Sequence, residues 1–181
     1  MKKALSLMLA LVLVLTAVSA FADGSVVPPT TSGTSTEEEI EIPIEVLPLD
    51  PDNPDLTDLI TAVNEGTILD TLTEETINNL HGTLGNDLDV IDVVVLKFPE
   101  DLVVTDDVVV TLSSLAYESI PEGTKLAAVI TSYSDAGTEE IVREAESNGD
   151  GTISFTLTPA MVAKLVAART VTCMIVRAKA E

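Results

Sequence analysis

The spacing of apolar residues changes along this chain. Residues 7–15 form an unbroken apolar run, and residues 53–84 place apolar residues three or four positions apart. From residue 89 onward the chain has short valine-rich runs and, at residues 152–157, a clean alternation of polar and apolar positions. A spacing of three or four is typical of one face of a helix, whereas a spacing of two is typical of a half-buried strand. The pattern therefore predicts an apolar leader, a helical segment and a β-rich domain.

Two short helices are expected before the β-rich domain. Asn53 is a good N-cap, and Pro54 suits the first helical position because its missing N–H has no helical partner there. Gly66 stands where a left-handed C-cap belongs. The second helix is expected to begin after Thr73 and to stop at Gly82. The apolar positions of the first helix, spaced i, i+3, i+4 and i+7, are Leu56, Leu59, Ile60 and Val63.

Six strands are expected in the β-rich domain. They cover residues 90–98, 103–112, 125–133, 138–145, 151–157 and 170–178. Short turns such as Asn148-Gly149-Asp150-Gly151 separate them, which favours antiparallel hairpins because a parallel pair needs a crossover of about a dozen residues or more. One further short helix is expected before the last strand, with Thr158 as N-cap and Pro159 at its first position.

Residues 23–49 are expected to form a flexible acidic linker rich in Ser, Thr and Pro. Within it, residues 40–46 alternate apolar with polar positions, which predicts a strand. Pro43 would confine that strand to a sheet edge because proline has no N–H to donate. A charged linker is the competing interpretation.

Together these elements predict a mainly β fold, an antiparallel two-sheet sandwich of about six to seven strands. Residues 50–88 would pack on the sandwich as a helical segment, and residues 89–181 would form the sandwich itself. This architecture resembles the immunoglobulin-like accessory domains of bacterial secreted proteins. A resemblance of architecture does not assign a function.

The apolar leader has the features of a secretory signal peptide. Lys2 and Lys3 precede it, and Ala20-Phe21-Ala22 follows as a small-residue cleavage site. A membrane-spanning helix needs about 20 apolar residues, which this run does not reach. We therefore expect a signal peptide over residues 1–22, cleavage after Ala22, and a secreted, extracellular protein of bacterial type without an integral membrane segment.

Cys173 is the single cysteine, so an internal disulfide cannot form and core packing must hold the exported chain together. It lies in the apolar run 171–176, which predicts a buried strand. We expect its thiol to behave as a small hydrophobe and not as a nucleophile.

The chain is strongly acidic, with 9 Lys and Arg residues against 30 Asp and Glu. Loss of Lys2 and Lys3 with the signal peptide leaves 7 against 30, a net charge of −23. Residues 23–96 contain 17 acidic residues and no Lys or Arg. Nucleic acid is excluded as a partner because its binding depends on basic side chains. Cations and basic surfaces remain as partners, although such charge also serves solubility alone.

Aromatic residues are scarce in the expected mature chain: Phe98, Tyr117, Tyr133 and Phe155. Sugar-binding modules and protein-binding hot spots favour exposed Trp and Tyr. Recognition through an aromatic platform is therefore not expected. Binding through backbone edges, carboxylates or aliphatic patches remains open.

Glu146, Asn148 and Asp150 are the candidate metal ligands. The string 146–154 resembles the calcium loop of EF-hand and dockerin modules, with oxygen ligands at alternate positions followed by Gly. Leu157 stands where that loop requires a bidentate Glu or Asp, and strands are expected where helices should flank it. A hairpin turn in which Asn and Gly take up positive φ explains the same residues without an ion. Calcium is thus the one cofactor that the sequence suggests.

A second oxygen-rich cluster precedes the first helix and consists of Asp50, Asp52, Asn53, Asp55 and Asp58. We interpret it as helix capping and an acidic connector, since it contains no glycine for the tight wrap of a calcium loop.

No catalytic residues are assigned. His81 is the single histidine and ends a predicted helix, where an imidazole suits the helix dipole. No Gly-x-Ser-x-Gly elbow is present in the sequence. We therefore do not expect an enzyme.

The leading hypothesis is an exported, non-enzymatic bacterial module with a structural or adhesive-interaction role toward an unknown protein or cell-surface partner. The alternatives are a calcium-dependent acidic surface protein and a small carboxylate-based hydrolase, which requires two carboxylates facing one cleft. Self-association through the valine-rich residues 90–96 is open if they lie at a sheet edge.

Overall fold

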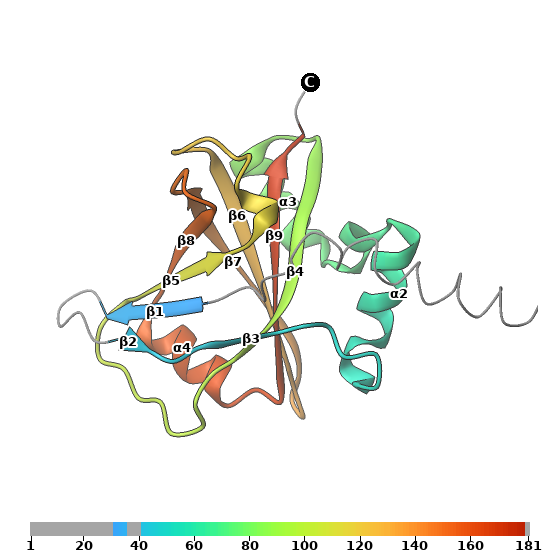
Figure 1. Cartoon of the computed structure of the whole chain (residues 1–181). Coiled ribbons are helices and arrows are strands. Elements are labelled where there is room, and N and C mark those ends of the chain that lie inside the picture. Colours follow the sequence, from blue (N-terminus) through green and yellow to red (C-terminus); the bar gives the residue numbers. More distant parts are fainter. Residues whose placement is uncertain (1–30, 36–40, 180–181) are drawn as a thin grey trace, which may run out of the picture.

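The computed structural model describes residues 31–35 and 41–179, so the predicted signal peptide lies outside the described residues (Figure 1). The strands of the described residues are β1 (Thr31–Ser35), β2 (Glu41–Ile42), β3 (Glu45–Leu47), β4 (Leu88–Lys97), β5 (Val108–Ser113), β6 (Lys125–Ser134), β7 (Gly137–Ser147), β8 (Thr152–Leu157) and β9 (Thr170–Ala178). The α-helices are α2 (Thr57–Glu65), α3 (Glu74–Leu84) and α4 (Pro159–Val166), and short 3-10 turns are η1 (Pro54–Leu56), η2 (Ile68–Thr71) and η3 (Leu115–Tyr117).

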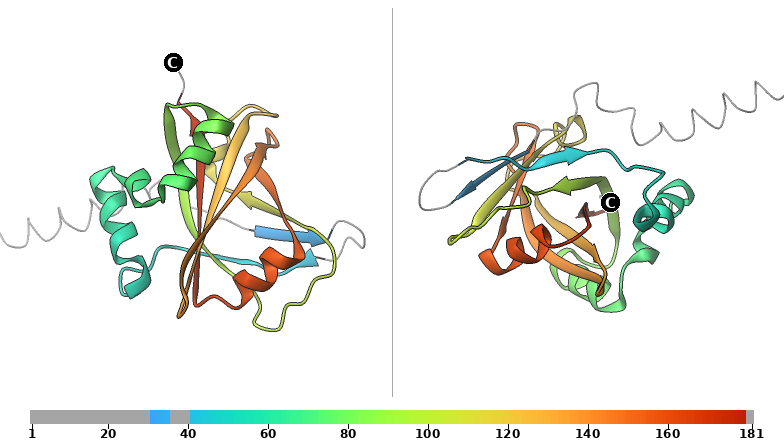
Figure 2. Two further views of the ribbon diagram at one scale, coloured as in Figure 1. Left: turned by 180° about the vertical axis from the view of Figure 1, so that it is seen from behind. Right: turned by 90° about the horizontal axis from the view of Figure 1, so that it is seen from below.

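The mainly β, antiparallel character of the fold is confirmed, but the expected two-sheet sandwich is corrected to one curled sheet (Figure 2). Within the described residues the strand order is β2-β1-β5-β8-β7-β6-β9-β4-β3. The reason lies in β7, which pairs with β6 through residues 137–146 and with β8 through residues 145–147. Hydrogen bonding therefore continues around the bend, and the strands do not separate into two layers.

Residues 41–47 join the two ends of this strand order. Ile42 in β2 pairs with Gly33 of β1, and Val46 in β3 pairs with Leu96 of β4. Pro43 lies between the two short strands, where a missing N–H costs no ladder hydrogen bond. The prediction of an edge strand is thus confirmed for residues 41–46, as two strands, whereas Ile40 lies outside the described residues.

Residues 31–35 fall within the expected linker but form β1, which pairs antiparallel with β5. The sequence signal was weak because this strand consists of Thr, Ser and Gly. Gly33 is needed for close packing: a Cβ there would lie 3.0 Å from Ile44 Cδ1.

Local signals located the helices well. Asn53 Oδ1 accepts a hydrogen bond from the backbone N–H of Asp55 at 3.0 Å, and Gly66 adopts a left-handed φ of 71° at the end of α2. Thr73 and Thr158 cap α3 and α4 as expected. The predicted stop at Gly82 is wrong, because α3 continues to Leu84. Gly85, with a φ of 95°, follows it and donates its N–H to the carbonyl of His81.

Most of the expected strands form within a few residues of their predicted bounds, and β5 is the exception. It begins at Val108 and not at residue 103. Val103 is 86% exposed, whereas Val104 is partly buried against the core, so this part of the valine-rich stretch is a loop that packs beside the sheet without pairing in it.

The sheet buries apolar side chains on both faces. Its concave face encloses the larger cluster, which α4 closes with Val162 and Leu165. Its outer face carries a second cluster that includes Val129 and Met174, and the helical segment covers this cluster with Leu56, Leu59 and Leu80 (Figure 2). The space between the helices and the outer face is where the candidate site lies.

In residues 31–35 and 41–179 no helix is long and apolar enough to cross a membrane.

The valine-rich β4 pairs with β9 and, through residues 95–97, with β3. Self-association through residues 90–96 therefore stays a prediction.

Candidate functional site

A groove of about 550 Å³ lies between the helical segment and the outer face of the sheet. Its lining comes from α2, η2 and α3 on one side and from β6, β7 and β9 on the other. The acidic side chains that line it are Asp55, Asp58, Glu75, Glu139 and Glu140. We call this space the acidic groove.

The floor of the acidic groove is a row of polar residues across three strands. Thr131 of β6 pairs with Glu140 of β7 on one side and with Thr172 of β9 on the other. Strand alternation directs Thr131 to the same face as Val129, which packs under the helices. Thr131 is 6% exposed and Thr172 is 4% exposed. Hydroxyl groups thus lie deep in the groove.

Glu140 fixes the beginning of α3. Its carboxylate accepts hydrogen bonds from the Thr73 hydroxyl at 2.8 Å and from the Thr73 backbone N–H at 3.1 Å. The Thr73 hydroxyl in turn accepts the backbone N–H of Thr76. The local sequence predicts Thr73 as the cap, whereas no local pattern points to Glu140, which follows 67 residues later.

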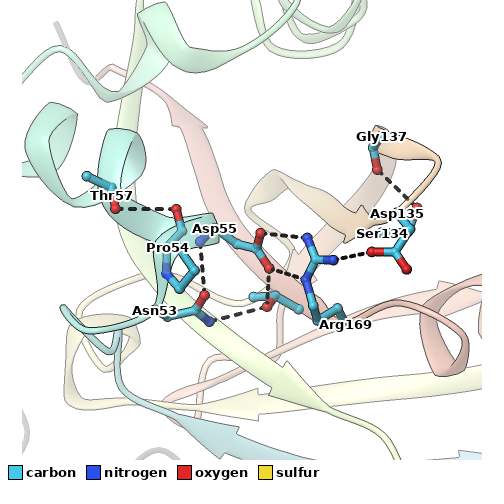
Figure 3. A network of polar contacts seen from close by, with 9 residues as sticks. Asn53, Pro54, Asp55, Thr57, Ser134, Asp135, Gly137 and Arg169 are labelled. Atoms are coloured by element: carbon cyan, nitrogen blue, oxygen red, sulfur yellow. Dashed lines mark hydrogen bonds and ion pairs between the residues drawn. The ribbon is translucent and has the colours of Figure 1, made fainter.

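Asp55 fixes the beginning of the helical segment (Figure 3). Its carboxylate accepts two hydrogen bonds from the Arg169 guanidinium, at 2.9 Å from Nε and 2.8 Å from Nη2, and a third from the Thr170 hydroxyl at 3.0 Å. The hydrogen bond from Arg169 is the main reason that the pKa of Asp55 lies below its ordinary value. Asn53 supplies the cap, so the carboxylate of Asp55 holds the helical segment to the sheet and makes no capping hydrogen bond among the described residues.

Arg169 connects three parts of the chain. Besides Asp55, it hydrogen-bonds through Nη1 to Asp135 in the β6–β7 turn. The same turn is closed by Ser134, whose hydroxyl donates to the carbonyl of Gly137 at 3.1 Å (Figure 3). One guanidinium thus ties the start of the helical segment to the sheet and to this turn.

Tyr133 is the aromatic side chain of the groove and is half-buried. Burial is the main cause that raises its pKa, and the nearby carboxylates of Glu140, Asp55 and Asp58 raise it further. Its phenol therefore stays protonated at neutral pH and presents a hydroxyl, not a negative charge.

The predicted calcium ligands lie elsewhere, at the β7–β8 hairpin. Glu146 is exposed near the end of β7 and pairs with Ser154 across the ladder. The Asn148 amide donates to the hydroxyls of Thr152 and Ser154 at 2.8 and 2.9 Å. Asp150 accepts the backbone N–H and hydroxyl of Thr152, and the hydroxyl bond is the main cause that lowers its pKa.

The β7–β8 hairpin has the geometry of a tight turn, as the interpretation without a calcium ion requires. Gly149 and Gly151 adopt φ of 76° and 82°, as a tight turn requires. Among the described residues, no three His, Cys, Asp or Glu side chains gather as metal ligands would. The assignment of Glu146, Asn148 and Asp150 to calcium stays a prediction.

Asp50, Cys173 and His81 have structural roles in the described part of the chain. Asp50 accepts the backbone N–H of Asp52 at 2.9 Å, which is a local turn contact. Cys173 is completely buried in β9, as predicted, and burial raises the pKa of its thiol. His81 supplies a backbone carbonyl near the end of α3.

Comparisons with protein-family models, curated proteins and solved structures found no match to this chain. A function must therefore be inferred from the groove itself.

Proposed function

We propose that this chain is an exported, non-enzymatic binding module with an adhesive-interaction or structural role, and that it contacts its partner through the acidic groove. The supporting observation is the charge of the groove. Five carboxylates line it, and two of them, Asp55 and Glu139, form ion pairs with Arg169 and Lys164. Three carboxylates therefore remain without a basic ion-pair partner among the described residues.

The contacts of these carboxylates favour binding over hydrolysis. A carboxylate-based hydrolase needs two carboxyl groups facing one cleft, one of which acts as an acid with a raised pKa. The groove does bring carboxylates together, so the first requirement is met. However, Glu140 is held by Thr73, and the lowered pKa of Asp55 suits a permanent ion pair and not a proton donor. Their roles are those of fixed acceptors.

Electrostatics sets the class of partner. A groove with excess negative charge attracts basic surfaces and repels nucleic acids and anionic lipids. The acidity of the rest of the chain adds to this attraction at long range, whereas the groove provides a localised site. An exported module of this kind would bind a basic group on an envelope component or on another secreted protein.

Binding to cells tests this proposal. The protein, purified after export and fluorescently labelled, would be added to cells of the producing organism from which its gene has been deleted. The variant D58N/E75Q removes two carboxylates of the groove that are exposed on the helices. The matched control E100Q/D101N removes the same charge from the exposed β4–β5 loop, outside the groove.

We expect the wild type and the E100Q/D101N control to be retained on the cells, and D58N/E75Q to lose most of that retention. Equal retention of both variants would show that net charge or another surface holds the protein on the cells, and not the acidic groove. That result, or the absence of retention by the wild type, would contradict the proposal.

A further inference from the structure

We propose that the acidic groove binds a primary alkylammonium group, to which the hydroxyl of Thr131 is the buried hydrogen-bond acceptor. This inference rests on the proposed function and specifies the chemistry of its ligand. Its starting point is that Thr131 is more than nine-tenths buried and lines the groove. Within residues 31–35 and 41–179, no group is hydrogen-bonded to its hydroxyl, whereas the buried hydroxyls of Thr76 and Ser147 have partners.

A buried polar group without a partner is costly, so native proteins rarely keep one without a reason. Thr131 lies between Glu140 and Thr172 in the ladder, and both oxygens of Glu140 are directed to Thr73. The hydroxyl of Thr131 is thus left for a group that enters the groove from solvent. Such a group would find hydroxyl oxygens at the floor and carboxylates at the walls.

The lining selects a cation that donates hydrogen bonds. A primary ammonium carries three N–H donors, no acceptor and one positive charge. The groove offers it acceptors, and none of its lining residues is Lys, Arg or His. Asp58 on α2 and Glu75 on α3 supply negative charge from the helical side. Anions such as phosphate are disfavoured by the same arrangement.

The groove also has apolar walls, formed by Leu59, Leu72, Val142 and Met174. These side chains would pack against methylene groups and so favour an alkyl chain over a bare metal ion. The ligand class is therefore an aliphatic primary amine. Two sources have this chemistry: the side chain of an accessible lysine on a partner protein, and a free aliphatic diamine.

Titration followed by NMR tests this inference. The protein purified after export would be titrated with 1,5-diaminopentane, with N-acetyl-lysine amide, and with 1-pentanol as a neutral analogue. We expect saturable shifts of the Thr131 and Thr172 methyl signals with the amines and no such shifts with pentanol. Tighter binding of the lysine derivative would indicate a protein partner, and tighter binding of the diamine a free amine. Either result supports the ammonium site.

Two variants separate the hydroxyl from the charge. T131V keeps the shape of the side chain, and we expect about tenfold weaker amine binding because one hydrogen bond to a charged group is lost. The melting temperature of T131V should be equal to or above that of the wild type, since the lost hydroxyl has no partner in the free protein. D58N/E75Q should also bind the amines more weakly, whereas E100Q/D101N should bind them as the wild type does.

The inference is overturned if the wild type binds neither amine, if pentanol binds as well as the amines, or if T131V binds with unchanged affinity. Its failure can be distinguished from failure of the proposed function. Absent amine binding together with cell retention that depends on Asp58 and Glu75 would reject only the alkylammonium ligand. Absent cell retention would reject the proposed function as well.

Discussion

The guanidinium of Arg169 donates two hydrogen bonds to the carboxylate of Asp55, across a sequence separation of 114 residues. A bidentate pair of this type fixes both the distance and the orientation of its partners. Here it attaches the first turn of the helical segment to the beginning of β9. Because the acidic groove lies between this segment and the sheet, the pair also sets the position of one groove wall.

Substitution of Asp55 by Asn should lower the melting temperature at pH 7 by a few degrees. The folded protein lowers the pKa of Asp55 from its ordinary value of 3.8, so the ionised form stabilises the fold above that pH. This contribution disappears as the pH falls through the lowered pKa. The difference in melting temperature between wild type and D55N should therefore shrink toward zero as the pH falls below the ordinary value of 3.8 and through the lowered pKa of Asp55.

D52N is the matched control, because Asp52 lies in the same connector and its carboxylate is exposed. It should melt as the wild type does at every pH. A constant difference between wild type and D55N across the whole pH range would show that ionisation of Asp55 does not matter. That outcome would contradict the role assigned to the pair.

Substitution of Tyr117 by Phe should destabilise the protein by about 1–3 kcal/mol. Tyr117 is 1% exposed, and its hydroxyl donates to Asp92 Oδ2 at 2.8 Å. Phe preserves the packing of the ring but leaves this carboxylate oxygen without its donor. Burial raises the pKa of Tyr117, so the hydroxyl keeps its proton and the loss should be similar across the neutral range.

Urea denaturation measures this loss directly. D92N provides the comparison: Asp92 accepts the Tyr117 hydroxyl with one carboxylate oxygen and the Val93 backbone N–H with the other. The single amide oxygen of Asn can replace only one of these acceptors, so we expect D92N to lose stability as well. If Y117F were as stable as the wild type, the contact would have no energetic role.

Local sequence signals predicted elements far better than they predicted how those elements meet. The caps at Asn53, Thr73 and Thr158 depend on residues within one helical turn, and each was predicted correctly. The joining of the sheet ends by residues 41–47 depends on pairing with Gly33 and Leu96, which no local pattern specifies. The same reason explains why two sheets were expected where one curled sheet forms.

The candidate site shows the same limit. Asp55 and Asp58 were interpreted as part of the helix capping, and they lie in the first turns of η1 and α2, although the cap hydrogen bond comes from Asn53. Their position in a groove depends on Arg169 and Glu140, which contact Asp55 and Thr73 only in the folded chain. Asp92 reaches Tyr117 from beside an irregularity in β4, between Val90 and Asp92, that alternation alone does not predict.

Cys173 should not react with a thiol reagent in the native protein. It is completely buried, and burial raises the pKa of its thiol, so both access and thiolate are lacking. Labelling with a chromogenic disulfide reagent should be absent under native conditions. In denaturant, where the thiol is accessible, labelling should be complete within a time on the order of minutes. Rapid labelling of the native protein would show that β9 opens locally.

Calcium should leave the melting temperature unchanged relative to a chelator. Asp150 and Asn148 already use their side chains to close the β7–β8 hairpin through Thr152 and Ser154. The measurement is a thermal melt with millimolar calcium or with EDTA. A rise of several degrees that is lost in D150N would instead support the calcium-dependent surface protein.

Strand β9 comes last in sequence among the described strands, yet it pairs with both β4 and β6. During synthesis, these two strands leave the ribosome before the partner that lies between them has been made. The sheet therefore cannot form strand by strand from the N-terminus. The edge of the valine-rich β4 that pairs with β9 stays without its partner strand until β9 has been made. A chain truncated before Thr170 would lack the strand that lies between β6 and β4, and the sheet would be interrupted there. Folding of the described sheet therefore depends on β9.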